Sequence, residues 1–561
     1  MKRLYTTLLL ATVCLTTFAT VKPRYQGWRA DWTPEMIPAS DMSEQPMHGP
    51  RRVGLHSNAP LTSMGSPKVP VILVQFTDLK FISGLPEGSQ CETGEDIELV
   101  NAYFDKFCNG LRDETSYWTE GGSMGAIREY FRDQSNGLFT PDFYVIGPVT
   151  LDNGYAYYGS DTGGKDKNLS QFYSDAIKKA QEIYNDWSIF DNNSDNKVDM
   201  AFFVFAGPGE NAFNLDKHPE AKDYIWPQER PTGGTLGGIQ YGCYACCNET
   251  YKDKPDGIGV FVHELSHAMG LPDLYDYNYL AYGMDYWDIM DSGCYCNNGY
   301  TPCGYSAYEK DFMGWQPLTT LSMDKPEHLV LQPMHAGGQA YKMVNPNNAN
   351  EYYVLENRQS DSWDTYIGRG TEKTHMHGML LTHINYVQSS WTSNKLNTMY
   401  APTTPQRCTI IAADGILDSY MNVMSLADQN IFYPSVLGDP FPGYQNVTDW
   451  EGTDSIAMPY WKPAKWEPVS SKDSLTIVKY PVAYTGTLDQ PLRHIVENAD
   501  GTVELDYCPR GEEPEPTSII AFEALAPKHG NDTLYDLQGR RVKNATHGGI
   551  YIRNGHKYLL K

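Results

Sequence analysis

Hydrophobic positions along the chain follow two different patterns, which meet near residue 325. In the first part, short and almost continuous apolar runs alternate with stretches of helical periodicity. Such runs are typical of strands buried on both faces, and their alternation with helices predicts an α/β domain. The expected strands are residues 69–76, 198–206 and 239–244, and the expected helices are residues 95–108, 123–134, 170–184 (with Ser170 as N-cap) and 306–313.

The second part is rich in short strand-like segments separated by turn residues. This texture predicts a β-sandwich-like domain over residues 326–510, followed by a stiff acidic linker at residues 511–516. Residues 517–561 predict a small module of strands and turns. The strands expected in the sandwich-like domain are residues 327–331, 351–355, 378–384 and 408–412.

The first residues have the pattern of an export signal. An apolar run that ends at Phe18 follows two basic residues, and Ala19 offers a small residue for cleavage. We therefore expect a signal peptide over residues 1–19 and a secreted or cell-surface protein. Residues 20–66 are rich in Pro, Met, Gly and charge without sustained periodicity, which predicts a pro-segment ahead of a domain at residues 67–325.

The charge of the chain limits its partners. It carries 69 acidic and 44 basic side chains, a formal net charge of −25. Binding of phosphate groups requires clustered Lys and Arg, so this charge argues against nucleic acid and anionic membrane surfaces as partners. No segment after the export signal is long and apolar enough for stable membrane insertion.

Eleven cysteines are present, and removal of the signal peptide leaves ten. An even number of cysteines in an exported chain predicts disulfide bonds. The alternative is a structural zinc site on the six cysteines that flank the segment described next, but export favours disulfides. These six are Cys243, Cys246, Cys247, Cys294, Cys296 and Cys303.

A segment in the middle of the chain has the spacing of a metal site. His263 and His267 lie four residues apart, so a helix places both imidazoles on one face. Glu264 follows the first histidine, where a carboxylate can act on metal-bound water as general base without becoming a ligand. Gly270 permits the turn that ends the helix, after which Asp273 can return as a third, oxygen ligand. Zinc accepts two imidazoles and one carboxylate and keeps a fourth position for water.

A short motif of this kind also arises by chance on surface helices. Here, however, residues 287–293 (WDIMDSG) follow it and resemble the Met-turn of metzincin peptidases, with Met290 as the methionine below the metal. The alternative for Met290 is an ordinary core methionine. Some metzincins place a tyrosine two residues later to support the oxyanion. Ser292 stands at that position here, so Tyr295 or Tyr305 takes the role or the role is absent.

A loop rich in Asn and Asp precedes the second expected strand. Oxygen side chains at its positions 1, 3, 5 and 9 match the front of a calcium-binding loop. It departs from an EF-hand because Asn196 replaces the turn glycine and Phe202 stands where the bidentate glutamate belongs. An Asn/Asp-rich turn that needs no ion explains the pattern equally well. The candidate calcium ligands are Asp191, Asn193, Asp195 and Asp199.

The similarity extends well beyond the metal motif. Roughly residues 66–450 resemble the immune inhibitor A family of secreted, metzincin-like metallopeptidases, an extent that a chance motif does not reach. The segments that carry the resemblance are residues 71–78 (VILVQFTD), 128–135 (REYFRDQS), 271–276 (LPDLYD), 306–310 (SAYEK), 314–315 (GW) and 353–358 (YVLENR).

This resemblance implies His263, His267 and Asp273 as zinc ligands, Glu264 as the catalytic glutamate and Met290 as the Met-turn residue. The fold class expected is an α/β metzincin-like zinc peptidase domain followed by a β-sandwich-like domain and a small β C-terminal module. That last module resembles the sorting domains of exported proteins in Bacteroidetes-type bacteria, which implies export machinery as a partner.

The function expected is that of a secreted zinc-dependent endopeptidase. Its substrates would be polypeptides that lie extended along the strand at residues 239–244, beside the cleft. The alternative is a secreted, calcium-dependent binding protein for glycans or cell surfaces, in which exposed aromatic residues of the β-rich domain bind the ligand. The complete His-Glu-x-x-His set argues against this alternative, because a binding protein needs no general base.

Overall fold

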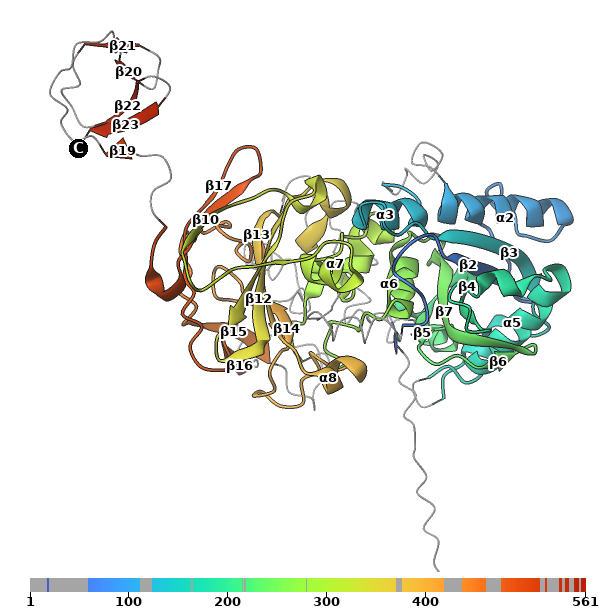
Figure 1. Cartoon of the computed structure of the whole chain (residues 1–561). Helices are drawn as coiled ribbons and strands as arrows, with labels where there is room; N and C mark the ends of the chain where they lie inside the picture. Colours follow the sequence, from blue (N-terminus) through green and yellow to red (C-terminus); the bar gives the residue numbers. More distant parts are fainter. Residues whose placement is uncertain are drawn as a thin grey trace, which may run out of the picture.

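The chain is described by a computed structural model, shown in Figure 1. It describes residues 18–19 and residues 59–514, except 111–123, 163–164, 214, 216–217, 279, 370–375, 418–435 and 461–475. In the C-terminal segment it describes residues 520–521, 534–536, 540–543, 549–553 and 556–560. The predicted signal peptide and pro-segment, apart from residues 18–19 and 59–66, lie outside the described residues.

The first half of the molecule is built on an eight-stranded mixed sheet with the order β1-β5-β7-β4-β2-β3, to which β6 and β8 add through β7. The four long strands β7, β4, β2 and β3 run parallel to one another. The strand β4 shows why the core forms here, because its sequence VDMAFFVFAGP is buried on both faces over almost its whole length. The bounds are β1 Phe18–Ala19, β2 Lys68–Gln75, β3 Asp142–Thr150, β4 Val198–Pro208, β5 Gln228–Arg230, β6 Thr235–Leu236, β7 Ile239–Tyr251 and β8 Lys254–Pro255.

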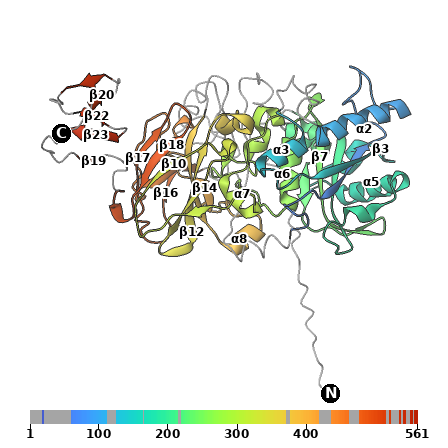
Figure 2. The same ribbon diagram turned by 45° about the horizontal axis from the view of Figure 1, so that its top comes forward.

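Helices cover both faces of this sheet, as Figures 1 and 2 show. On one face α2, α3 and α6 pack against alternate strand residues such as Val71 and Phe202, and on the other face α5 packs against Ile72 and Phe203. The expected α/β architecture is therefore confirmed. The helix bounds are α2 Gly94–Asn109, α3 Ile127–Gln134, α4 Tyr155–Gly159, α5 Leu169–Ile183, α6 Gly259–Ala268, α7 Ala307–Met313 and α8 Gln388–Thr392.

One expected helix cap is wrong. Asn168, not Ser170, stands at the N-cap position of α5. The hydroxyl of Ser170 lies inside the first turn and accepts a hydrogen bond from Arg230 Nη1 at 2.8 Å. The tertiary contact with the edge strand β5 thus replaces the local capping role.

The second half contains further β-sheets, as expected, although their arrangement as a sandwich remains a prediction. One sheet has five strands in the order β14-β13-β12-β11-β9, one has three in the order β10-β18-β17, and β15 pairs with β16. The bounds are β9 Thr319–Thr320, β10 Glu327–Leu331, β11 Tyr341–Asn345, β12 Asn348–Arg358, β13 Gly378–Asn385, β14 Cys408–Ile410, β15 Ser455–Tyr460, β16 Thr476–Pro481, β17 Leu492–Glu497 and β18 Val503–Tyr507.

The C-terminal segment forms a separate five-stranded sheet with the order β19-β23-β22-β20-β21. It lies at one end of the molecule in both views (Figures 1 and 2). A sorting role for this sheet stays a prediction. Its strands are β19 Ile520–Ala521, β20 Leu534–Asp536, β21 Arg541–Val542, β22 Gly549–Arg553 and β23 His556–Leu560.

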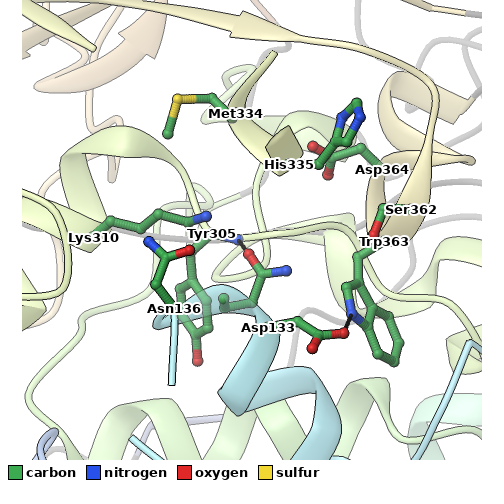
Figure 3. A pocket seen from close by; sticks show the side chains of 10 residues that line it. Asp133, Asn136, Tyr305, Lys310, Met334, His335, Ser362, Trp363 and Asp364 are labelled. Carbon is green, nitrogen blue, oxygen red and sulfur yellow. Dashed lines mark hydrogen bonds between the residues drawn. The ribbon is translucent and has the colours of Figure 1, made fainter. Parts of the chain in front are cut away.

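A single hydrophobic core joins the two halves. It runs from Leu61 through the helices of the first sheet to Tyr507 and Cys508 in the last strand region of the β-rich part. A small pocket lies on this junction, where α3 and α7 meet two short 3-10 helices (Figure 3). It is lined by Asp133, Gln134, Asn136, Tyr305, Lys310, Met334, His335, Ser362, Trp363 and Asp364.

Three of the family-like segments, residues 128–135, 306–310 and 353–358, meet at this junction. Arg358 is fully buried and donates from Nε and Nη2 to Asp364 at 2.8 and 2.7 Å. Burial, with the nearby charge of Arg358, lowers the pKa of Lys310 to about 8. These segments therefore hold the two halves together rather than lining the metal motif.

The expected disulfide bonds are wrong. None of the ten cysteines outside the N-terminal segment forms a disulfide bond in the described part of the chain, and all ten are buried. The three on β7 explain the error, because strand alternation sends Cys243 and Cys247 to one face of the sheet and Cys246 to the other. Their thiols pack as small apolar groups. The ten cysteines are Cys91, Cys108, Cys243, Cys246, Cys247, Cys294, Cys296, Cys303, Cys408 and Cys508.

Within the described residues, no helix combines the length and apolar character that crossing a bilayer requires.

Candidate metal centre and active site

The helix α6 carries both histidines of the metal motif and is held firmly against the sheet. The ring of Phe261 stacks on Phe202 of β4, with ring centroids 3.6 Å apart. At the start of the helix, Gly259 approaches the carbonyl oxygen of Cys294 so closely that a Cβ atom would lie 1.8 Å from it. These contacts fix the depth at which the histidine face of α6 is buried.

Gly270 turns the chain directly after α6. Its φ of +101° lies in the left-handed region, and its N–H donates to His267 O at 2.9 Å. The chain then returns so that Asp273 Oδ1 lies 3.2 Å from His263 Nε2 and 3.3 Å from His267 Nε2. All three side chains are fully buried.

Backbone carbonyls set the orientation of the two imidazoles. His263 Nδ1 lies 2.8 Å from Ile289 O, and His267 Nδ1 lies 2.7 Å from Leu271 O. Since carbonyl oxygens only accept, each Nδ1 carries the proton and each Nε2 presents a lone pair. Burial lowers the pKa of His263 to about 4, which keeps this imidazole neutral.

The three inner atoms of the cluster therefore all accept rather than donate. The two Nε2 atoms and Asp273 Oδ1 lie within 4.8 Å of one another. A buried carboxylate facing two imidazole lone pairs is the donor set that a zinc ion fits.

The other oxygen of Asp273 is held by two residues that sequence reasoning missed. Asp273 Oδ2 accepts hydrogen bonds from Tyr277 Oη and from Asn394 Nδ2, each at 2.6 Å. Tyr277 lies four residues downstream, whereas Asn394 lies 121 residues away in the β-rich half. No local spacing in the sequence could have connected Asn394 with the metal motif.

The remaining predicted residues of the centre lie as follows. Glu264 is fully buried on α6, one residue after His263. Met290 is also fully buried, and its carbonyl oxygen accepts from Leu274 N at 2.9 Å. The preceding residue is Ile289, whose carbonyl orients His263, so the turn that contains Met290 lies against the cluster.

Both tyrosines expected for oxyanion support are buried. The hydroxyl of Tyr305 is paired with Ser266 Oγ on α6. Tyr295 is buried within a 3-10 helix, η7, at Ser292–Gly299. The tyrosine that the structure brings to the cluster is Tyr277.

The strand expected beside the cleft at residues 239–244 is longer in the structure, Ile239–Tyr251. The segment 239–244 belongs to β7, which lies inside the sheet between β4 and β5. Both β7 and β5, Gln228–Arg230, contact α6, and β5 runs antiparallel to β7. The strand β5 was not expected, because its sequence is short and polar and only its pairing identifies it as a strand.

The Asn/Asp-rich loop brings three of its four candidate ligands together. Carboxylate oxygens of Asp191, Asp195 and Asp199 lie within 4.8 Å of one another. Asn193 Oδ1 instead accepts from Asp195 N at 2.9 Å. Asp199 is almost fully buried, its Oδ1 has no hydrogen-bond partner in the described structure, and burial raises its pKa to about 6.

Comparison with known proteins supports the interpretation of α6 and its surroundings. Residues 229–317 match the family described as immune inhibitor A peptidase M6, catalytic domain. The chain is 27% identical over 304 residues to immune inhibitor A of Bacillus thuringiensis subsp. alesti, and this alignment covers 47% of this chain and 43% of that protein. It is 25% identical over 275 residues to the pre-pro-metalloprotease PrtV of Vibrio cholerae, which covers 44% of this chain and 29% of that protein.

The chain thus spans less than half the length of the curated relatives it matches. The matched segment contains the whole His263–Asp273 cluster, Glu264 and Met290. By its sequence, this segment is similar to the catalytic domain of the immune inhibitor A peptidases of family M6.

Proposed function

We propose that this protein is a secreted zinc-dependent endopeptidase that hydrolyses peptide bonds of extracellular proteins. The observation that carries the proposal is the buried convergence of His263 Nε2, His267 Nε2 and Asp273 Oδ1, next to the buried carboxyl of Glu264. Neutral imidazoles and an ionised carboxylate are the protonation states that metal binding requires. Secretion rests on the predicted signal peptide, which lies outside the described residues apart from residues 18–19.

Zinc, when bound, supplies a Lewis acid that polarises the peptide carbonyl and brings the pKa of its water near neutrality. In our proposal Glu264 accepts the proton of the attacking water and delivers it to the leaving amine. Its burial beside α6 keeps bulk water away from this proton transfer. His263, His267 and Asp273 are the residues that would hold the ion, and Met290 supports them from below.

We propose β5 as the strand that binds the polypeptide substrate. The outer edge of β5 pairs antiparallel with residues 18–19 in the structure, with Phe18 opposite Glu229 and Ala19 opposite Gln228. This pairing supports the proposal, because the outer edge of β5 pairs with a short extended segment in the way that β-augmentation requires.

A protease assay tests this function directly. Purified protein should cleave casein, lose that activity with 1,10-phenanthroline, and regain it when zinc is restored. A protein that binds zinc but cleaves no protein substrate would favour the alternative of a binding protein built on a peptidase-like domain.

We also propose that the loop at residues 191–199 binds calcium. The supporting observation is the buried Asp199 Oδ1, which has no hydrogen-bond partner in the described structure and which a cation would satisfy, on a carboxylate close to those of Asp191 and Asp195. Calcium should raise the thermal unfolding midpoint of the wild type in zinc-replete buffer, and Asp199→Asn should abolish the rise. If calcium does not change the unfolding midpoint of the wild type, the loop is an Asn/Asp-rich turn that binds no calcium.

A further inference from the structure

The carboxylate of Asp273 is held in place from outside the metal motif. Its Oδ1 faces the two imidazoles, while its Oδ2 accepts from Tyr277 Oη and Asn394 Nδ2. The backbone N–H of Asp273 also donates to Asn394 Oδ1 at 2.5 Å. The side-chain amide of Asn394 thus binds Asp273 twice, once at the backbone N–H of the aspartate and once at its carboxylate.

Asn394 itself is fixed by the β-rich half of the molecule. It follows α8, its N–H donates to Trp391 O at 3.0 Å, and Trp391 is buried against Tyr386. Its φ of +55° lies in the left-handed region, which asparagine tolerates better than most residues. Only 2% of its surface is exposed, so its amide cannot exchange partners with solvent.

Tyr277 completes the network. Its hydroxyl lies 2.5 Å from Asn394 Nδ2 and 2.6 Å from Asp273 Oδ2. The hydroxyl and the amide together occupy Oδ2, which leaves Oδ1 as the oxygen that faces the histidines. A carboxylate without these two donors could rotate and present either oxygen, or turn away from the cluster.

We infer that Asn394, with Tyr277, is a positioning residue for the metal ligand Asp273, so that tight zinc binding requires the β-rich half as well as the metal motif. The inference rests on the proposed zinc site. Partners that orient metal ligands typically contribute about 10- to 100-fold in metal affinity. The α/β half would by this reasoning hold all three ligands and yet bind zinc weakly when the loop around Asn394 is displaced.

The chain offers a matched control in Asn397. This asparagine lies three residues further along, is fully buried and also connects the two halves. Its Nδ2 donates to Leu274 O and Cys408 O, each at 2.6 Å, and its Oδ1 accepts from Cys408 N at 2.9 Å. It forms no hydrogen bond with a ligand side chain, so its replacement measures the loss of loop structure alone.

The experiment measures the zinc dissociation constant of the full chain by competition with a chromophoric chelator, together with the thermal unfolding midpoint. Asn394→Ala should weaken zinc binding at least tenfold, and Asn397→Ala should lower the midpoint with about threefold change or less in zinc affinity. Tyr277→Phe removes one hydroxyl without disturbing the loop and should weaken zinc binding in the same direction. If Asn394→Ala does not fold, the zinc affinity of Tyr277→Phe decides whether Asp273 is positioned by this network.

The outcomes separate the two proposals. A wild-type protein that binds no zinc would refute the proposed function itself. Zinc binding by the wild type that is unchanged in Asn394→Ala and Tyr277→Phe would refute only the positioning role. Equal losses of zinc affinity in Asn394→Ala and Asn397→Ala would also refute it, because they would reflect general loosening of the loop.

Discussion

At the scale of single residues, local spacing was sufficient to predict the metal cluster and insufficient to predict its support. His263, His267 and Asp273 were predictable because a helix and one glycine turn determine their positions. Asn394 was not, since its contact with Asp273 depends on how two distant parts of the chain pack. Residues that orient ligands are the part of a site that a sequence pattern conceals.

The role of Glu264 gives the first prediction at this scale. Glu264→Gln should retain zinc, because the three proposed ligands are unchanged, and should lose nearly all hydrolysis, because the amide cannot accept the proton. Metal content and casein cleavage of the purified variant check this. Retention of more than about a tenth of wild-type turnover would contradict the assignment of Glu264 as general base.

The choice of the third zinc ligand gives the second prediction at this scale. Asp273→Ala should lower zinc occupancy, whereas Asp276→Ala should leave it largely intact. Both oxygens of Asp276 already accept backbone N–H groups, from Leu280 and Met399 at 2.7 and 2.9 Å. Metal analysis of the two folded variants distinguishes them, and the reverse pattern would transfer the ligand role to Asp276.

At the scale of elements, apolar runs in the sequence predict the buried strands well. Short polar elements have no such signal and are missed. The expected strand at residues 69–76 is β2 at Lys68–Gln75, and the one at 327–331 is β10. The short, polar β5 was missed, because only pairing with β7 makes it a strand. Helix starts were also missed where no capping side chain marks them, as at Ile127 of α3.

The predicted pro-segment also contains an element that belongs to the folded core. Leu61 is fully buried, and its N–H donates to Ala268 O at the end of α6 at 3.0 Å. Leu61→Ala should therefore lower the free energy of unfolding by about 2–5 kcal/mol. Met64→Ala, at a side chain that is 41% exposed, should change it by less than about 0.5 kcal/mol, and chemical denaturation measures both. Equal effects would place Leu61 outside the core.

At the scale of the whole molecule, composition predicts cysteines oxidised to disulfides, whereas the fold keeps them as separate thiols. An exported chain with ten cysteines suggested disulfides, yet the fold distributes these thiols over two sheet faces and both halves. Sequence alone could not reveal this, because pairing depends on the distance between side chains in the folded chain. The predicted domain boundary near residue 325 likewise marks a change in the hydrophobic pattern of the sequence, but the hydrophobic core continues across it.

Free thiols at all ten positions can be counted. Titration of the denatured protein from residue 20 onward with a thiol reagent should detect ten thiols, and the native protein should react slowly because every cysteine is buried. Burial also raises the pKa of Cys91 to about 11 and that of Cys246 to about 12, which reduces the reactive thiolate further. Detection of two thiols or fewer after denaturation would restore the disulfide interpretation.

The junction between the two halves gives a prediction for pH. Burial lowers the pKa of Lys310 to about 8 from its ordinary 10.5, so between these values the unfolded chain binds more protons than the folded chain. Stability contributed by this group therefore rises with pH across that window. Lys310→Met removes the effect, and its unfolding free energy relative to wild type should fall by about 2–3 kcal/mol between pH 7 and pH 10. The buried thiols titrate in both proteins and cancel in this difference.

The matched control for this experiment is Lys325→Met, at a lysine whose side chain is 67% exposed and pairs only with Glu327 at the surface. Its difference from wild type should stay constant over the same pH range, because little free energy is at stake in an exposed ion pair. Chemical denaturation at several pH values provides both comparisons. A Lys310→Met difference that also stays constant would mean that Lys310 is solvated in the folded protein, and that the pocket at the junction is open to water rather than part of the shared core.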